Sequence, residues 1–293
     1  TTEISLFDGL EWENADFFSD NNIRVFDSPE FSVESGGELW ISTWSGLVGF
    51  DGNEWKLYNT DVADWLVKTP DGRLWTESWD LDGIASFDGQ KWNLEFDTDN
   101  SLIDATTTNT VLATSNGMIL LGTDQGLFQY DPVLNSITDL KLGQVNVNSM
   151  LEAHDGSIWV CAEDQNQLKK LSRLHDGQWT THLPNQAITT IYQSPTNDLW
   201  AGGDDGLYLF DGNVWRRELT DKVNCLYQLT DGTMLVGSNS GLWIELSIDS
   251  FELAVHQREL WVKGLFQASN GVIWCRSNQG IFSYDGQSWT KHW

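Results

Sequence analysis

The chain has 293 residues, with 43 acidic and 16 basic side chains, a formal net charge of -27, 17 tryptophans, 26 glycines and 5 prolines. This negative field repels phosphate backbones and anionic lipid, so nucleic acid and membrane surfaces are excluded as expected partners. No apolar run is long enough for a membrane-spanning helix, and no signal peptide is visible, which leaves the compartment open.

A tryptophan position recurs along the chain, each time after a turn signal such as Asp-Gly or Asn-Gly. Its successive copies are Trp40, Trp75, Leu120, Trp159, Trp200, Leu235 and Trp274. A period of about 40 residues, with four strand-sized segments in each period, is the spacing of a β-propeller blade. Tryptophan needs a defined packing environment, so we expect this position to be structural.

The second half of each copy repeats as well. It begins with Gly-Leu or Gly-Ile, continues to Phe-Asp-Gly or Tyr-Asp-Gly, and ends at a second tryptophan position. That position holds Trp12, Trp55, Trp92, Trp179, Trp215 and Trp289. Glycine and Asp-Gly supply the positive φ that tight hairpin turns need. Each copy therefore predicts four strands, A to D, of which A is the inner strand and D the outer strand.

A sheet of this kind has two apolar faces and is covered only when units stack face to face. We therefore predict one all-β domain over residues 1–293, a seven-bladed propeller of four-stranded antiparallel blades. The repeats are predicted at 31–60, 61–100, 105–142, 145–183, 186–219, 222–255 and 260–293. Residues 1–30 hold an extra half-repeat, expected to cap the propeller. The alternative is eight blades with an incomplete N-terminal blade.

The repeat DG-x-[LI]-W-x-x-[TS]-x-x-GL-x-x-[FY]DG-x-x-W resembles the two-component regulator propeller repeat over nearly the whole chain. Residues 70–92 and 197–215 carry the motif most cleanly, whereas the third, fourth and sixth copies depart from it. The resemblance implies a sensor-type propeller in an extracellular or periplasmic location. Family members often form the sensing part of bacterial signalling proteins, and many of those respond to saccharide fragments.

Six tryptophans lie outside the two repeated positions, and four of them fall in two kinds of loop. Trp44 and Trp79 fall in B–C loops, and Trp65 and Trp261 fall where a D–A connection enters strand A. B–C and D–A loops open on the same face of a propeller, and the seventh, first and second copies are neighbours once the ring closes. We therefore expect these rings on one sector of one face.

Two charged residues depart from the pattern in the same copies. Glu77 and Arg276 stand two positions after the first tryptophan, where most copies have a small residue. Aromatic faces beside hydrogen-bonding groups are how proteins hold sugars, since C–H faces stack and hydroxyls bond to polar groups. The predicted ligand-binding residues are Trp44, Trp65, Trp79 and Trp261 for stacking and Glu77, Asp80, Asp82 and Arg276 for hydrogen bonds.

The leading hypothesis is a non-catalytic recognition propeller that binds a small ligand, with a saccharide as the expected class. One alternative is a protein-interaction scaffold, because tryptophan-rich patches also anchor interfaces. Another is a glycan-processing hydrolase or lyase, in which Glu77 pairs with Asp80 or Asp82. In the structural alternative, the off-pattern tryptophans only pack long loops.

We expect no cofactor and no catalytic metal. The five histidines show no ligand-like spacing, and Cys161, Cys225 and Cys275 are expected to be buried free thiols. A weak Ca²⁺ option uses the loop oxygens of Asp97, Asp99 and Asn100 or of Asp204 and Asp205, but neither group completes an EF-hand pattern.

Overall fold

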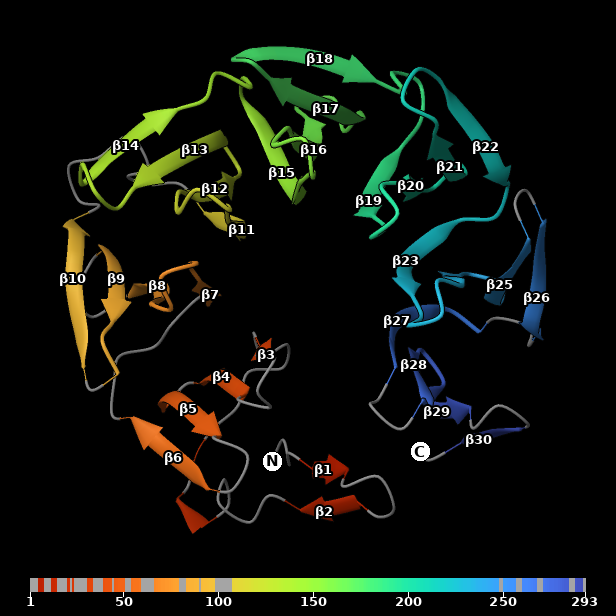
Figure 1. Cartoon of the computed structure of the whole chain (residues 1–293), viewed down its shortest axis with the longest axis horizontal. Coiled ribbons are helices and arrows are strands. Elements are labelled where there is room, and N and C mark those ends of the chain that lie inside the picture. Colours follow the sequence, from red (N-terminus) through yellow and green to blue (C-terminus); the bar gives the residue numbers. More distant parts are fainter. Residues whose placement is uncertain are drawn as a thin grey trace. The chain divides into compact units, whose positions relative to one another are not determined.

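The computed structural model of the chain is built from β-strands arranged as sequential antiparallel sheets (Figure 1). The structure describes residues 5–7, 12–14, 20–21, 23, 31–33, 39–43, 45–50, 54–58, 66–78, 83–89, 91–97, 107–247, 250–256, 260–267, 271–284 and 288–291. The chain divides into two compact units, Thr1–Gly143 and Gln144–Trp293, which are described separately.

The first unit contains three four-stranded sheets and a two-stranded hairpin. The hairpin pairs β1 (Ser5–Phe7) with β2 (Trp12–Asn14). The sheets are β3 (Phe31–Val33), β4 (Leu39–Thr43), β5 (Gly46–Phe50) and β6 (Trp55–Tyr58); β7 (Val67–Lys68), β8 (Leu74–Ser78), β9 (Gly83–Phe87) and β10 (Trp92–Asp97); and β11 (Thr108–Ala113), β12 (Ile119–Thr123), β13 (Gly126–Asp131) and β14 (Ser136–Asp139).

The second unit contains four more four-stranded sheets. They are β15 (Val145–Glu152), β16 (Ile158–Asp164), β17 (Lys169–His175) and β18 (Gln178–His182); β19 (Ile188–Gln193), β20 (Leu199–Gly203), β21 (Gly206–Phe210) and β22 (Trp215–Leu219); β23 (Val223–Gln228), β24 (Met234–Ser238), β25 (Gly241–Ser247) and β26 (Ser250–His256); and β27 (Val262–Gln267), β28 (Ile273–Ser277), β29 (Gly280–Tyr284) and β30 (Trp289–Lys291).

These seven sheets confirm the predicted fold class, a seven-bladed β-propeller, and they are numbered blades 1 to 7 in chain order. In each blade the four strands pair with their neighbours in sequence, so A, B, C and D form an antiparallel meander. Within the second unit, the A strands lie on the inner side of the unit and the D strands on its outer side (Figure 1). The β1–β2 hairpin is the predicted N-terminal half-repeat. Its capping role and the single-domain assignment stay predictions.

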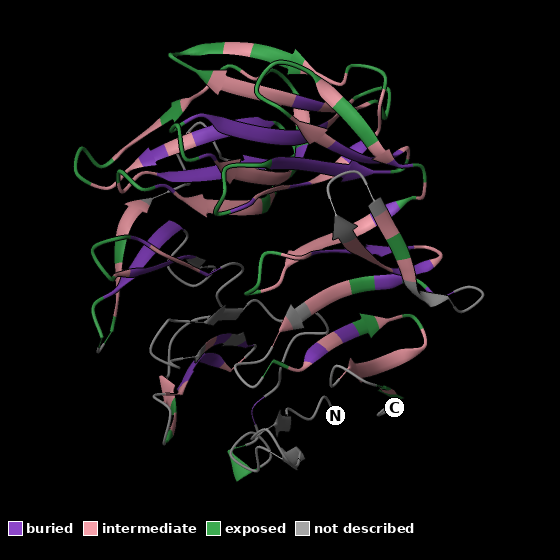
Figure 2. Ribbon diagram, turned by 45° about the vertical axis from the view of Figure 1, so that its right-hand side comes forward, coloured by how far each residue is buried: buried purple, intermediate pink, exposed green. Residues whose placement is uncertain are grey.

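Apolar cores between consecutive blades hold each unit together. In the first unit, Trp75 and Ile84 of blade 2 pack with Tyr130 of blade 3. In the second, Trp159 and Leu171 of blade 4 pack with Tyr208 of blade 5. Trp75 and Trp159 are 0% and 2% exposed, which confirms a structural role for the first tryptophan position in these two blades. The buried residues gather on the B and C strands (purple in Figure 2).

The requirement for a small residue two positions after the first tryptophan comes from the next blade. A Cβ atom on Gly202 would lie 2.5 Å from Cγ1 of Val223, and one on Gly237 would lie 2.7 Å from Cγ1 of Val262. In blade 7 the large and small residues are exchanged, with the large side chain on strand B and the glycine on strand A. Arg276 takes the small position, and its cross-strand partner on strand A is Gly264, over which the Arg276 side chain lies.

This packing predicts different outcomes for two Gly-to-Ala substitutions. Gly237→Ala should lower the free energy of unfolding by about 1–3 kcal/mol, because its methyl group overlaps Val262 and Cys225. Gly264→Ala is the matched control, since its Cβ would sit in ordinary contact, 3.4 Å from Arg276 Nε. Urea titrations followed by tryptophan fluorescence measure both. Equal midpoints for the two variants would contradict this explanation of the small-residue position.

Candidate functional site

Most of the predicted ligand-binding residues fall where the structure gives no description. Trp44, Trp65, Trp79, Asp80 and Asp82 lie outside the described residues. Glu77 belongs to strand β8, where its Cα pairs with that of Ile84, and its side chain is not described. Of the Ca²⁺ option, Asp99 and Asn100 also lie outside, and Asp97 ends β10. These assignments stay predictions.

Trp261 is described, and it stands immediately before strand β27 with 45% of its surface exposed. Its backbone is fixed at two points by Asn278 of the B–C turn of the same blade. The Trp261 N–H donates to Asn278 Oδ1 at 2.7 Å, and the Asn278 N–H donates to the Trp261 carbonyl at 3.2 Å. The turn therefore holds the main chain while the indole ring stays available to a ligand.

The same clamp operates elsewhere, so it is part of the fold. In blade 3 the Asp124 N–H donates to the Thr107 carbonyl at 3.0 Å, and the Thr107 N–H donates to Asp124 Oδ1 at 3.1 Å. In blade 5 the Asp204 N–H bonds to the Ala187 carbonyl. The position before strand A is thus a display position with a fixed backbone. Blade 7 fills it with tryptophan.

Arg276 is exposed on strand β28, in the same blade as Trp261. Within the described part of the chain it has no hydrogen-bond or ion-pair partner. Burial raises the pKa of the neighbouring Cys225 thiol to about 12, and the Arg276 guanidinium acts weakly against that rise. The guanidinium is exposed, and its predicted role in ligand binding stays a prediction.

A row of amide side chains, absent from the sequence prediction, links blades 6 and 7. The Asn239 N–H donates to the Lys222 carbonyl at 3.2 Å. Asn224 Nδ2 donates to Asn239 Oδ1 at 3.0 Å and to the Val262 carbonyl, next to Trp261, at 3.1 Å. We call Asn224, Asn239, Trp261 and Asn278 the polar rim. It follows the B–C turns and D–A connections of these blades.

Asp204, in the B–C turn of blade 5, extends the rim to blade 4. Its carboxylate pairs with Lys222 Nζ at 2.5 Å and with Lys169 Nζ at 2.9 Å. The hydrogen bond from Lys222 lowers the pKa of Asp204, and Lys169 adds to that effect. Asp205 Oδ2 accepts the Ala187 N–H at 2.8 Å. The Asp204–Asp205 pair is therefore engaged by protein cations and backbone, which argues against it as a Ca²⁺ site.

Groups of three or more metal-ligating side chains in suitable positions were not found in the portion of the chain that the structure covers. Cys161 and Cys275 are buried and Cys225 is partly buried, and all three are free thiols.

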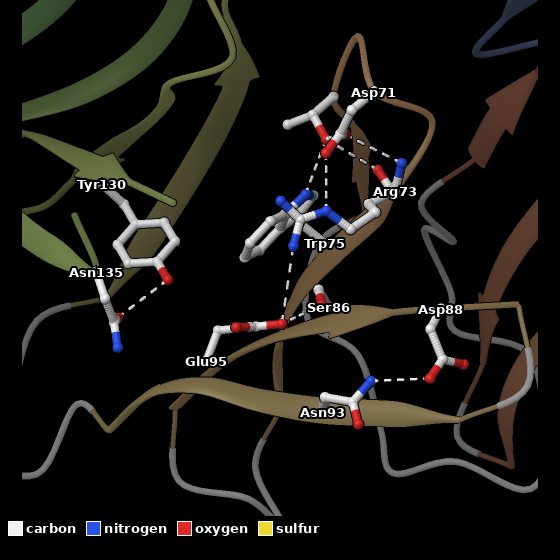
Figure 3. Close-up of polar contacts among 10 residues, drawn as sticks. Asp71, Arg73, Trp75, Ser86, Asp88, Asn93, Glu95, Tyr130 and Asn135 are labelled. Carbon is white, nitrogen blue, oxygen red and sulfur yellow. Dashed lines mark hydrogen bonds and ion pairs between the residues drawn. The ribbon is translucent and has the colours of Figure 1, made fainter. Parts of the chain in front are cut away.

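A second polar cluster surrounds Trp75 at the A–B turn of blade 2 and the start of strand β8 (Figure 3). The Arg73 guanidinium sits over the Trp75 ring, 4.7 Å from its centroid, and Arg73 Nε pairs with Asp71 Oδ2 at 2.8 Å. Trp75 Nε1 donates to Thr69 Oγ1 at 2.9 Å. These groups satisfy one another, so we assign the cluster a structural role.

Blade 4 repeats this device with different residues. Arg173 lies over Trp159 at 5.5 Å from the ring centroid, and its Nη2 pairs with Asp155 Oδ2 at 2.5 Å. In both blades the aspartate belongs to the A–B turn. The arginine covers the end of a buried tryptophan and is neutralised there. Recurrence in two blades supports the structural assignment.

Comparisons with known proteins identify the fold. No protein-family model and no curated protein sequence matches the chain. Among solved structures, the extracellular domain of the hybrid two component system BT3049 from B. thetaiotaomicron is similar to this chain. The TM-score is 0.63, and the identity is 18% over 86% of this chain. That of BT4673 from the same organism has a TM-score of 0.60 and 19% identity over 79% of this chain.

This chain spans only 39% and 33% of the lengths of those two chains. Virginiamycin B lyase from Staphylococcus aureus is also similar, with a TM-score of 0.58 and 13% identity over 86% of this chain and 93% of the lyase. The two extracellular domains match the two-component regulator propeller that the repeat resembles. At these identities the likeness establishes the fold. The described residues include no helix that is long and apolar enough to cross a membrane.

One histidine makes the stability of the packing around Trp159 depend on pH. The His182 ring lies 4.6 Å from the Trp159 ring, and its Nδ1 accepts the Trp215 Nε1 proton at 3.2 Å. Burial lowers the pKa of His182, and the nearby Arg173 charge lowers it further. Below the ordinary histidine pKa of about 6.5 the unfolded chain therefore binds a proton more readily than the folded chain.

We predict that His182 contributes stability that is fully present above about pH 6.5 and is lost as the pH falls toward its lowered folded-state pKa, at no more than about 1.4 kcal/mol per pH unit. His182→Gln should reduce the slope of unfolding free energy between pH 7 and 5.5 relative to the parent protein. Urea titrations across this range measure the slopes. The assignment fails if the His182→Gln and parent slopes agree.

Proposed function

We propose that this propeller is a non-catalytic recognition domain that binds a small ligand, a saccharide, through its B–C and D–A loops in an extracytoplasmic setting. The observation that carries the proposal is Trp261, a half-exposed indole on a doubly hydrogen-bonded backbone. A ring whose backbone is already held in place needs less ordering when a ligand stacks on it.

The groups around Trp261 support a sugar ligand. Asn224 and Asn239 belong to the same rim, and amides both donate and accept hydrogen bonds, as hydroxyl groups require. Arg276 adds exposed donors in the same blade. The other predicted residues, Trp44, Trp65, Trp79, Glu77, Asp80 and Asp82, are proposed for the same kind of loop in blades 1 and 2.

The solved structures support the sensory part of the proposal. Two of the similar structures are extracellular domains of two component system proteins, and this fits a sensing role outside the cytoplasm. The lyase likeness carries only the fold, at 13% identity. We therefore favour recognition over the hydrolase or lyase alternative.

A second function, docking of a protein, is favoured by one exposed apolar tip. Val133 and Leu134 are 87% and 73% exposed on the C–D turn of blade 3. The turn is rigid, because Asp131 Oδ1 accepts the N–H groups of Val133 at 2.8 Å and Leu134 at 2.9 Å. Exposed apolar side chains on a turn with a hydrogen-bonded backbone are typical of interface anchors.

The saccharide proposal is tested by isothermal titration calorimetry against a panel of oligosaccharides. For any ligand that binds, Trp261→Ala should weaken binding about tenfold or more, because stacking is lost, and Trp261→Phe should restore much of the affinity. The matched control is Val214→Ala, which truncates an apolar side chain that is 61% exposed on a C–D turn. Trp79→Ala tests the prediction in blade 2.

Two results would overturn the assignment. One is that no oligosaccharide binds the parent protein. The other is that a ligand binds Trp261→Ala and Trp79→Ala as tightly as it binds the parent.

A further inference from the structure

The distribution of positive charge on the second unit is more specific than a general sugar site requires. The chain has only 16 basic side chains against 43 acidic ones. Two ammonium groups at one point of its surface are therefore an unusual concentration of positive charge. Lys169 begins strand β17, and Lys222 lies between β22 and β23. Both reach Asp204 in the B–C turn of blade 5.

We propose that Lys169 and Lys222 form an anion subsite that receives the carboxylate or sulfate group of an acidic saccharide. The inference rests on the proposed function, because it names the chemical class of the same ligand. The polar rim would bind the sugar hydroxyls, and the two lysines would bind the charged substituent.

The geometry leaves both lysines able to bind a ligand. Each ammonium has three N–H donors, and the pairing with Asp204 uses one donor of each. The side chains of Lys169 and Lys222 are 26% and 45% exposed, so their remaining donors can reach solvent. Asp204 keeps the two ammonium groups together, and these three side chains sum to one positive charge, while the adjacent Asp205 carboxylate accepts the Ala187 N–H.

The backbone at the cluster is held in place before any ligand arrives. The Asp204 N–H donates to the Ala187 carbonyl at 2.9 Å. The Lys222 carbonyl accepts the Asn239 N–H at 3.2 Å. Hydrogen bonds of the turns therefore fix two of the three main-chain positions, and little ordering is needed when an anion binds.

A continuous set of hydrogen bonds connects this cluster to Trp261. It runs from the Lys222 carbonyl through Asn239 and Asn224 to the carbonyl of Val262, the residue that follows Trp261. One path on the second unit thus offers a charged end, amide groups and an aromatic end. This sequence of groups matches an extended saccharide that carries an anionic substituent away from its stacked ring.

A purely structural role for the ion pairs gives different expectations. Lys169, Asp204 and Lys222 connect elements of blades 4 and 5 and the start of blade 6, so they could act only as a latch. For a latch, Asp204→Asn would lower stability and change no affinity. For an anion subsite, Asp204→Asn removes the competing carboxylate and should strengthen binding of an acidic ligand several-fold.

Calorimetric titration with matched acidic and neutral oligosaccharides tests the inference. Oligogalacturonates and their methyl esters form one pair, and sulfated oligosaccharides and their desulfated forms are the other, which separates carboxylate from sulfate recognition. An acidic member should bind about tenfold more tightly than its neutral counterpart. Lys222→Gln and Lys169→Gln should each remove about threefold of that preference for the acidic member and leave neutral binding unchanged.

The control is Lys91→Gln, which changes an exposed lysine on the C–D turn of blade 2. It should bind as the parent does. Thermal unfolding of each variant shows that it is folded. The inference is overturned if acidic and neutral members bind equally, or if both lysine variants bind the acidic member as the parent does, and in either case the proposed saccharide function stands. If no oligosaccharide binds, the proposed function and this inference both fall.

Discussion

The structure depends on one constraint, which is that every blade has two apolar faces to bury. A four-stranded sheet with buried B and C strands is stable only when a neighbour covers each face. Trp75 against Tyr130 in the first unit, with ring centroids 5.7 Å apart, meets this need through the first tryptophan position. Trp159 meets it in the second unit by packing against Trp215, 5.8 Å away.

Because packing buries the faces of the blades, the turns are the parts of the fold that can contact a ligand. The B–C turns and the positions before strand A are bonded to each other, as Asn278 is to Trp261. This bonding frees the side chain at each display position from a structural task. Ala187 and Trp261 can therefore occupy the same place without changing the fold, and specificity can vary while the cores stay constant.

The repeat made the fold predictable, whereas the site was only partly so. The blades follow from the period, and Trp261 and Arg276 were predicted as ligand-binding residues because they depart from the pattern, a role that stays a prediction. The sequence did not show why Arg276 is tolerated, since that depends on Gly264 lying directly opposite it on the neighbouring strand. The convergence of Lys169 and Lys222 on Asp204 also escaped prediction. It joins residues from different blades, and their spacing depends on how the sheets stack.

The central claim is that the polar rim and its lysine extension contact the ligand. Hydrogen–deuterium exchange with mass spectrometry, run with and without a binding oligosaccharide, tests this directly. The account predicts slower exchange in peptides covering the B–C turns and D–A connections of blades 5 to 7, including residues 220–224 and 237–241. Protection confined to the A–B turns, such as residues 153–157, or no protection in the second unit, would contradict it.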